Sequence, residues 1–152
     1  MANDKKVAVL VRKGLPYKRT ILYGHARARE LGGKLLLIGV VPRLDGARMM
    51  SMALCEVAPY EDVARGLEGE AVEFLEWAIQ FCLDKGITAE SRIETGGLDV
   101  VMKRACEDRG IGLVLIPTPT NEEHHREFLS AIKGFAQDVI DRELRCPIVS
   151  VV

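Results

Sequence analysis

The chain has 152 residues and a mass of 16.8 kDa, which suits one compact domain better than two domains with thin cores. Hydrophobic residues make up 48% and charged residues 28%, a globular balance that excludes a disordered protein. Because 21 Lys and Arg residues face 22 Asp and Glu residues, the net charge of -1 argues against nucleic acid or a membrane surface as partner.

Targeting and redox features are absent from the sequence as it stands. No cleavable apolar segment follows the first residues, and no apolar run approaches the ~20 residues that span a bilayer. The four cysteines lack the spacing of a metal site or a redox pair. We therefore expect a cytoplasmic protein with one domain over residues 1–152, reduced thiols, and neither metal nor cofactor.

The first half of the chain alternates apolar runs with helical patterns. Continuous apolar runs at 7–11 and 35–41 are typical of strands buried on both faces of a parallel sheet. The stretch from Thr20 to Leu31 between them predicts a helix that stops at Gly32 and Gly33. A second, long helix is predicted to end at Gly86. It is indicated by apolar residues that recur every three or four positions and would form one face of the helix, namely Val63, Leu67, Ala71, Phe74, Ala78 and Phe81.

An irregular insert, Pro42 to Glu61, precedes the long helix and is rich in methionine. Such a segment can serve as an adaptable surface for a partner. The alternative, which we favour, is a flap that packs over the domain's own core.

The second half continues the alternation. Residues 87–94 alternate apolar and polar side chains, which predicts an edge strand with one wet face. The run at 113–116 predicts another buried strand, and 147–152 a closing one. Two further helices are predicted, the first from Leu98, Val101, Met102 and Ala105, the second from Phe128, Ile132, Phe135, Val139 and Ile140.

This order predicts an α/β fold with an open, doubly wound, five-stranded parallel sheet. Right-handed crossovers and the edge character of the third strand give the order 3-2-1-4-5, with helices on both faces. Ligands of such sheets bind at the carboxyl ends of the strands, where the order reverses. The candidate loops are therefore Arg12–Arg19 and Pro117–His125.

Two segments carry a resemblance to a known family. Arg27–Val41 is similar to the first helix and second strand of the universal stress proteins. Ala131–Val152 is similar to their last helix and strand, because Gly134 opens the helix and Cys146-Pro147 leads into a valine-rich strand. The resemblance covers nearly the whole chain. It implies an adenine-nucleotide alpha hydrolase-like fold and a stress-response or regulatory role.

The family includes members that bind ATP, and the sequence departs from their motif. Those members carry an aspartate after the first strand and a Gly-x2-Gly-x9-Gly-Ser/Thr run after the fourth, whose backbone N–H groups approach the phosphates. Arg12 stands at the aspartate position, while Pro117 and Thr120 replace two glycines. Phe135 follows Gly134 where a hydroxyl residue belongs, and 17 positions separate Pro117 from Gly134 against 13 in the motif. We therefore expect a member that lacks the usual ATP site and acts through binding.

A basic loop at the predicted switch point supports a second hypothesis. It is either a solvated surface loop or a pocket for an anion or nucleotide, held in a way that differs from the family motif. The candidate ligand-binding residues are Arg12, Lys13, Gly14, Pro117, Thr118, Thr120 and Gly134.

The sequence gives little support for a catalytic site or a metal site. His124 and His125 follow two glutamates, but adjacent helical residues diverge, so a polar helix start is favoured over a metal site. Cys146 has no accompanying base, and no Walker A sequence or Ser/His/Asp order is present. A nucleotide hydrolase is the least favoured hypothesis, and we expect no enzyme activity.

The last strand forms an almost unbroken apolar edge. Its interface residues would be Ile148, Val149, Val151 and Val152. In many universal stress proteins this strand pairs across a two-fold axis, so the resemblance implies a homodimer. The alternative is a monomer whose edge is covered. An unidentified protein partner is also compatible with a role in binding.

Overall fold

The computed structural model describes residues 5–41, 60–119, 126, 129–130, 132–133, 136–137 and 148–151, with the main chain alone at 60–64 and 148–151. The elements are β1 (Lys6–Val11), α1 (Lys18–Leu31), β2 (Leu35–Val41), α3 (Tyr60–Asp84), β3 (Ala89–Thr95), α4 (Leu98–Glu107), β4 (Ile111–Pro117) and β5 (Ile148–Val151).

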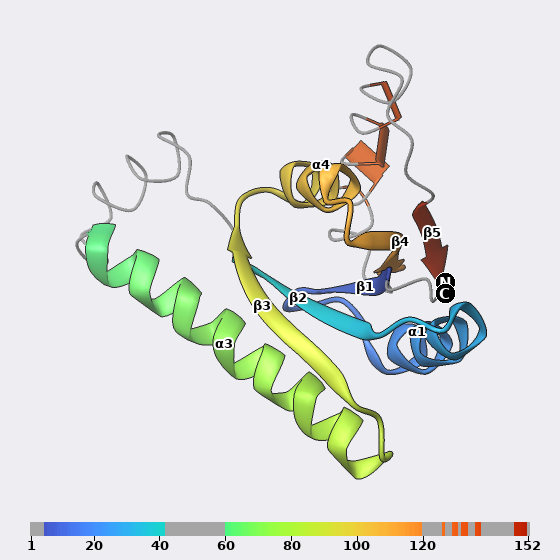
Figure 1. Cartoon of the computed structure of the whole chain (residues 1–152). Helices are drawn as coiled ribbons and strands as arrows, with labels where there is room; N and C mark the ends of the chain where they lie inside the picture. The colour runs from blue at the N-terminus through green and yellow to red at the C-terminus, as the bar shows by residue number, and fades with distance from the viewer. Residues whose placement is uncertain are drawn as a thin grey trace.

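The strands form one parallel sheet in the order β3-β2-β1-β4-β5. The predicted order 3-2-1-4 is thereby confirmed, and β5 pairs with β4 through the register Val114↔Ile148. Helices cover both faces, as predicted: α1 and α3 lie on one side of the sheet and α4 on the other (Figure 1). The order reverses between β1 and β4, so their carboxyl ends flank the switch point.

β1 lies in the interior of the core, because this strand has neighbours on both edges and helices on both faces. Val7, Ala8, Val9 and Leu10 have no exposed surface. Alternate residues enter opposite clusters: Ala8 packs on the α4 side, while Val9 packs on the side of α1 and α3. The prediction of strands buried on both faces is confirmed for β1, β2 and β4.

Two helices end at the glycines that were predicted from the sequence to stop them. Gly32 after α1 and Gly86 after α3 adopt positive φ angles of 68° and 69°. Each permits a closing hydrogen bond one residue later: the Gly33 N–H donates to the Ala28 carbonyl at 2.9 Å, and the Ile87 N–H donates to the Cys82 carbonyl at 2.8 Å. These are Schellman caps, which reverse the chain into β2 and β3.

The prediction for the third strand is partly wrong. Its edge position is confirmed, but β3 begins at Ala89, and Ile87 is a buried member of the cap that ends α3. The expected alternation of burial is also lost, because Ile93 is 39% exposed whereas Arg92 and Glu94 are half-buried. The two side chains form an ion pair, in which Arg92 Nε lies 3.1 Å from Glu94 Oε1.

The predicted stripe of α3 needs a correction too. Phe74 and Phe81 are half-buried and flank the stripe that packs on the sheet, whose fully buried members are Ala71, Leu75, Ala78 and Cys82. The helix is rotated in this way because Leu75 fills the space above Gly39 of β2, where a Cβ would lie 3.1 Å from Leu75 Cδ2.

Several predictions concern residues outside the described part of the chain. They include Pro42–Pro59 of the methionine-rich insert, Thr120, the His124–His125 pair, Gly134, Phe135, Cys146 and Val152. Of the last predicted helix, helical main chain is described at 126, 129–130, 132–133 and 136–137, and Ile132 packs against the α4 cluster. None of the described helices has the length and apolar character needed to cross a bilayer.

Candidate functional site

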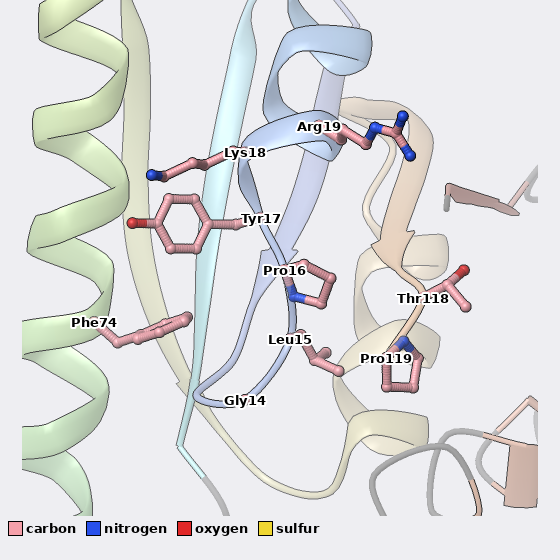
Figure 2. A pocket seen from close by; sticks show the side chains of 9 residues that line it. All are labelled: Gly14, Leu15, Pro16, Tyr17, Lys18, Arg19, Phe74, Thr118 and Pro119. Carbon is pink, nitrogen blue, oxygen red and sulfur yellow. The ribbon is translucent and has the colours of Figure 1, made fainter. Parts of the chain in front are cut away.

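A pocket of about 510 Å³ opens at the carboxyl ends of β1 and β4 (Figure 2). Its residues come from both loops beside the switch point and from α3. They are Gly14, Leu15, Pro16, Tyr17, Lys18, Arg19, Phe74, Thr118 and Pro119. This is the place where doubly wound sheets hold their ligands.

Aromatic rings form one wall of this pocket. The rings of Tyr17 and Phe74 meet edge to face with centroids 5.2 Å apart, and Phe81 lies 6.2 Å from Tyr17. Burial raises the pKa of the Tyr17 phenol above its ordinary value of 10.0, at which the hydroxyl already keeps its proton at neutral pH. The wall can therefore pack against a flat apolar group and offer one hydroxyl donor beside it.

The pocket also receives the positive end of α1. This helix begins at Lys18 with no acidic residue in its first turn, and Tyr17 provides no side-chain cap. Lys18 extends toward α3, where its ammonium lies 5.9 Å from the centre of the Phe81 ring, while Arg19 extends to the opposite side (Figure 2). The helix dipole and the two cations give this end of the pocket a field that favours anions.

A second cavity of about 330 Å³ lies on the other side of the same loop, between the end of β1 and α3. Arg12 and Lys13 contribute positive charge, and Glu70 from α3 faces them. Lys13 Nζ lies 3.0 Å from Glu70 Oε2. Gly14, with a φ of 91°, lines both cavities and so forms the boundary between them.

The predicted ligand-binding residues divide between the two cavities. Thr118 lines the larger one, Arg12 and Lys13 line the smaller one, and Gly14 lines both. Pro117 is the buried last residue of β4 and lines neither cavity. Thr120 and Gly134 lie outside the described residues.

Several lining residues were not among the predicted ligand-binding residues, and the most important of them are Tyr17, Phe74 and Glu70. Phe74 was assigned to the core stripe of α3, because an apolar residue at helical spacing ordinarily packs inward. The half-burial of Phe74 and the exposure of Glu70 depend on how α3 is rotated against the sheet. One signal was present in the sequence, since Tyr17 directly precedes the predicted helix within the candidate loop.

Metal binding finds no donor set in the part of the chain that the structure describes. There, no three His, Cys, Asp or Glu side chains are grouped so that they could hold a metal ion.

No protein-family model and no curated protein matches the sequence. The fold matches a universal stress family protein from Burkholderia pseudomallei with a TM-score of 0.67, at 14% identity over 99% of this chain and 98% of the other. It matches the universal stress protein UspA from Lactobacillus plantarum with a TM-score of 0.65, at 15% identity over the full length of both chains.

The fold is that of the universal stress proteins. A third match, to the universal stress protein from Archaeoglobus fulgidus in complex with dAMP, has a TM-score of 0.60, at 16% identity over the full length of both chains. The resemblance noted in the sequence is thus confirmed at the level of the fold. The universal stress fold of this chain carries both cavities at its switch point.

Proposed function

We propose that this chain is a universal stress-type protein with a regulatory role, exercised by binding a small anionic ligand that carries a flat ring. The observation that supports this most directly is the pocket of about 510 Å³, which combines an aromatic wall with the positive end of α1. A ring packs against Tyr17 and Phe74, and an anion is stabilised by the basic loop. An adenine nucleotide has both parts.

The relative from Archaeoglobus fulgidus, whose structure holds dAMP, makes a nucleotide the first ligand to test. The mode of binding that we propose differs from the ATP motif of the family. Arg12 replaces the motif's aspartate with a cation, and Pro117 cannot donate an N–H to a phosphate. The phosphate would instead be held by the β1–α1 loop, in the smaller cavity that Arg12 and Lys13 line together with Gly14.

The test begins with the protein as purified. Denaturing it and identifying the released small molecules by mass spectrometry shows whether a nucleotide co-purifies. Titration calorimetry with AMP and ATP then compares the wild type with Arg12→Gln and with the control Arg109→Gln, an exposed residue before β4 at the other end of the sheet. We expect Arg12→Gln to weaken binding about tenfold, the effect of one charged hydrogen bond, and Arg109→Gln to leave it unchanged.

An absence of both co-purified nucleotide and binding heat would overturn the proposal. A cytoplasmic protein that acts only through protein partners would then be the better account. Because we propose binding without turnover, incubation of the wild type with ATP and Mg²⁺ should release no phosphate above the rate without protein.

A second part of the proposal concerns assembly. β5 is the last strand in the sheet order, so one of its edges has no strand neighbour among the described residues. An edge of this kind offers main-chain donors and acceptors to another chain. We propose an isologous homodimer through Ile148, Val149, Val151 and Val152.

A further inference from the structure

The smaller cavity contains an ion pair that an anionic ligand has to disturb. We propose that Glu70 competes with the ligand for Lys13: it holds Lys13 while the site is empty, and the anionic group of the ligand displaces it. This inference rests on the proposed function, because it concerns the same site and the same class of ligand.

Lys13 is the group for which Glu70 and the ligand compete. Its ammonium lies 3.0 Å from Glu70 Oε2, and the pair connects the loop after β1 to α3 across a cavity that Arg12 also lines. The Lys13 and Glu70 side chains are 65% and 51% exposed. A solvent-exposed ion pair of this kind is weak, so an anion with more negative charge can replace the carboxylate.

Charge decides which ligands make that exchange. A phosphate that approaches Arg12 and Lys13 meets the Glu70 carboxylate in the same cavity, and two anions cannot share one ammonium without repulsion. A phosphate with close to two negative charges offers Lys13 more than the single carboxylate does. A neutral nucleoside carries no charge that could replace the carboxylate, so the Lys13–Glu70 pair stays intact when such a ligand binds. Glu70 would therefore weaken the binding of phosphorylated ligands, which have to displace it from Lys13, and leave the binding of their neutral counterparts unchanged.

Gly14 lies at the boundary between the two cavities. It stands next to Lys13 in the sequence and lines both cavities, and it has no side chain to obstruct a ligand that crosses it. A nucleotide could therefore place its ring against Tyr17 and Phe74 while its phosphate reaches Lys13.

The experiment is a double-mutant cycle measured by calorimetry, with AMP and adenosine as probes. The proteins are the wild type, Glu70→Gln, Lys13→Met and the double variant. Glu76→Gln is the matched control, because it removes the same charge from an exposed position of α3 outside both cavities. We expect Glu70→Gln to tighten AMP binding about fivefold, the upper range for an exposed pair, and to leave adenosine binding unchanged.

The cycle separates displacement from simple repulsion. In the Lys13→Met background the gain from Glu70→Gln should fall below about twofold, and Glu76→Gln should give no gain in either background. An equal gain with and without Lys13 would mean that Glu70 only repels the phosphate, which overturns the inference. If AMP binds the wild type and Glu70→Gln equally well, the inference alone fails. If AMP binds none of the proteins, the proposed function fails and the inference fails with it.

Discussion

At the scale of single residues, Gly24 brings α1 into close approach to the sheet. A Cβ at this position would lie 3.0 Å from Val9 Cγ2, 3.1 Å from Leu35 Cδ1 and 3.2 Å from Leu115 Cδ1. These three side chains are 1% exposed or less, so they cannot move aside into solvent. Gly24 therefore sets how near α1, and with it the loop that carries the candidate site, comes to the strands.

Gly24→Ala should destabilise the protein by ~1–2 kcal/mol, because overpacking outweighs the gain in helix propensity. Gly69→Ala is the matched control, since Gly69 is also helical but would place its Cβ in open space. That substitution should stabilise the protein by up to ~1 kcal/mol. Urea denaturation of both variants measures the difference. Effects of the same sign would contradict the assigned packing of α1.

At the scale of elements, Asp108 connects the end of α4 to two strands. Its Oδ1 accepts a hydrogen bond from the Gly110 N–H at 2.8 Å, just before β4, and its Oδ2 lies 3.2 Å from Arg92 Nη1 on β3. The Gly110 hydrogen bond is the main cause that lowers the pKa of Asp108 below its ordinary value of 3.8, and Arg92 lowers it further. The ionised carboxylate is thus the form that the fold stabilises.

This shift predicts a pH dependence with a definite sign. A carboxyl whose pKa is lower in the folded state stabilises the fold above its unfolded pKa and loses that contribution as the pH falls through the folded value. Asp108→Ala should therefore be less stable than the wild type at pH 7, and the gap should shrink below about pH 4. Asp108→Asn keeps an acceptor for Gly110 and should lose less stability. A gap that is the same at pH 7 and pH 3 in urea denaturation would contradict the role of the charge.

The sequence predicted the buried elements better than their boundaries. β1, β2 and β4 were predictable because strands covered on both faces consist of continuous apolar runs. β3 was placed two residues early, because Ile87 continues the local alternation but is recruited by the cap of α3. The candidate loop after β1 was predictable from the strand order alone, because the position of a switch point depends on the topology of the sheet and not on how side chains pack.

The remaining part of the site could not be predicted, because it depends on the rotation of one helix. Phe74 and Glu70 lie on α3, whose rotation is fixed where Leu75 meets the missing side chain of Gly39. That contact joins residues 36 positions apart, and no local pattern in the sequence records it. Periodicity identified the helix but could not tell which of two neighbouring stripes would face the sheet.

At the scale of the whole molecule, the sheet that the described residues form has two edges of different character. β3 forms one edge and carries charged side chains, among them Glu90, whose pKa is lowered by a hydrogen bond from Lys6. Edge charges of this kind discourage pairing with another chain. β5 forms the other edge, with the sequence Ile-Val-Ser-Val. The contrast supports assembly through β5 and not through β3.

Deletion of Val149–Val152 should therefore convert a dimer into a monomer. Light scattering after size exclusion should give twice the 16.8 kDa chain mass for the wild type and a single chain mass for the shortened protein. Circular dichroism of both proteins shows whether the fold survives the deletion. A shortened protein that remains a well-folded dimer, or a monomeric wild type, would contradict assembly through this edge.

The aromatic wall of the pocket also makes it possible to follow ligand binding by fluorescence. Trp77 is the single tryptophan of the chain; its side chain is 55% exposed and its ring lies 6.1 Å from Phe74. Phe74 in turn contacts Tyr17, so only one ring separates the indole from the pocket. The protein thus carries a built-in fluorophore beside its candidate site, and the emission of that fluorophore can report occupancy of the pocket without any label.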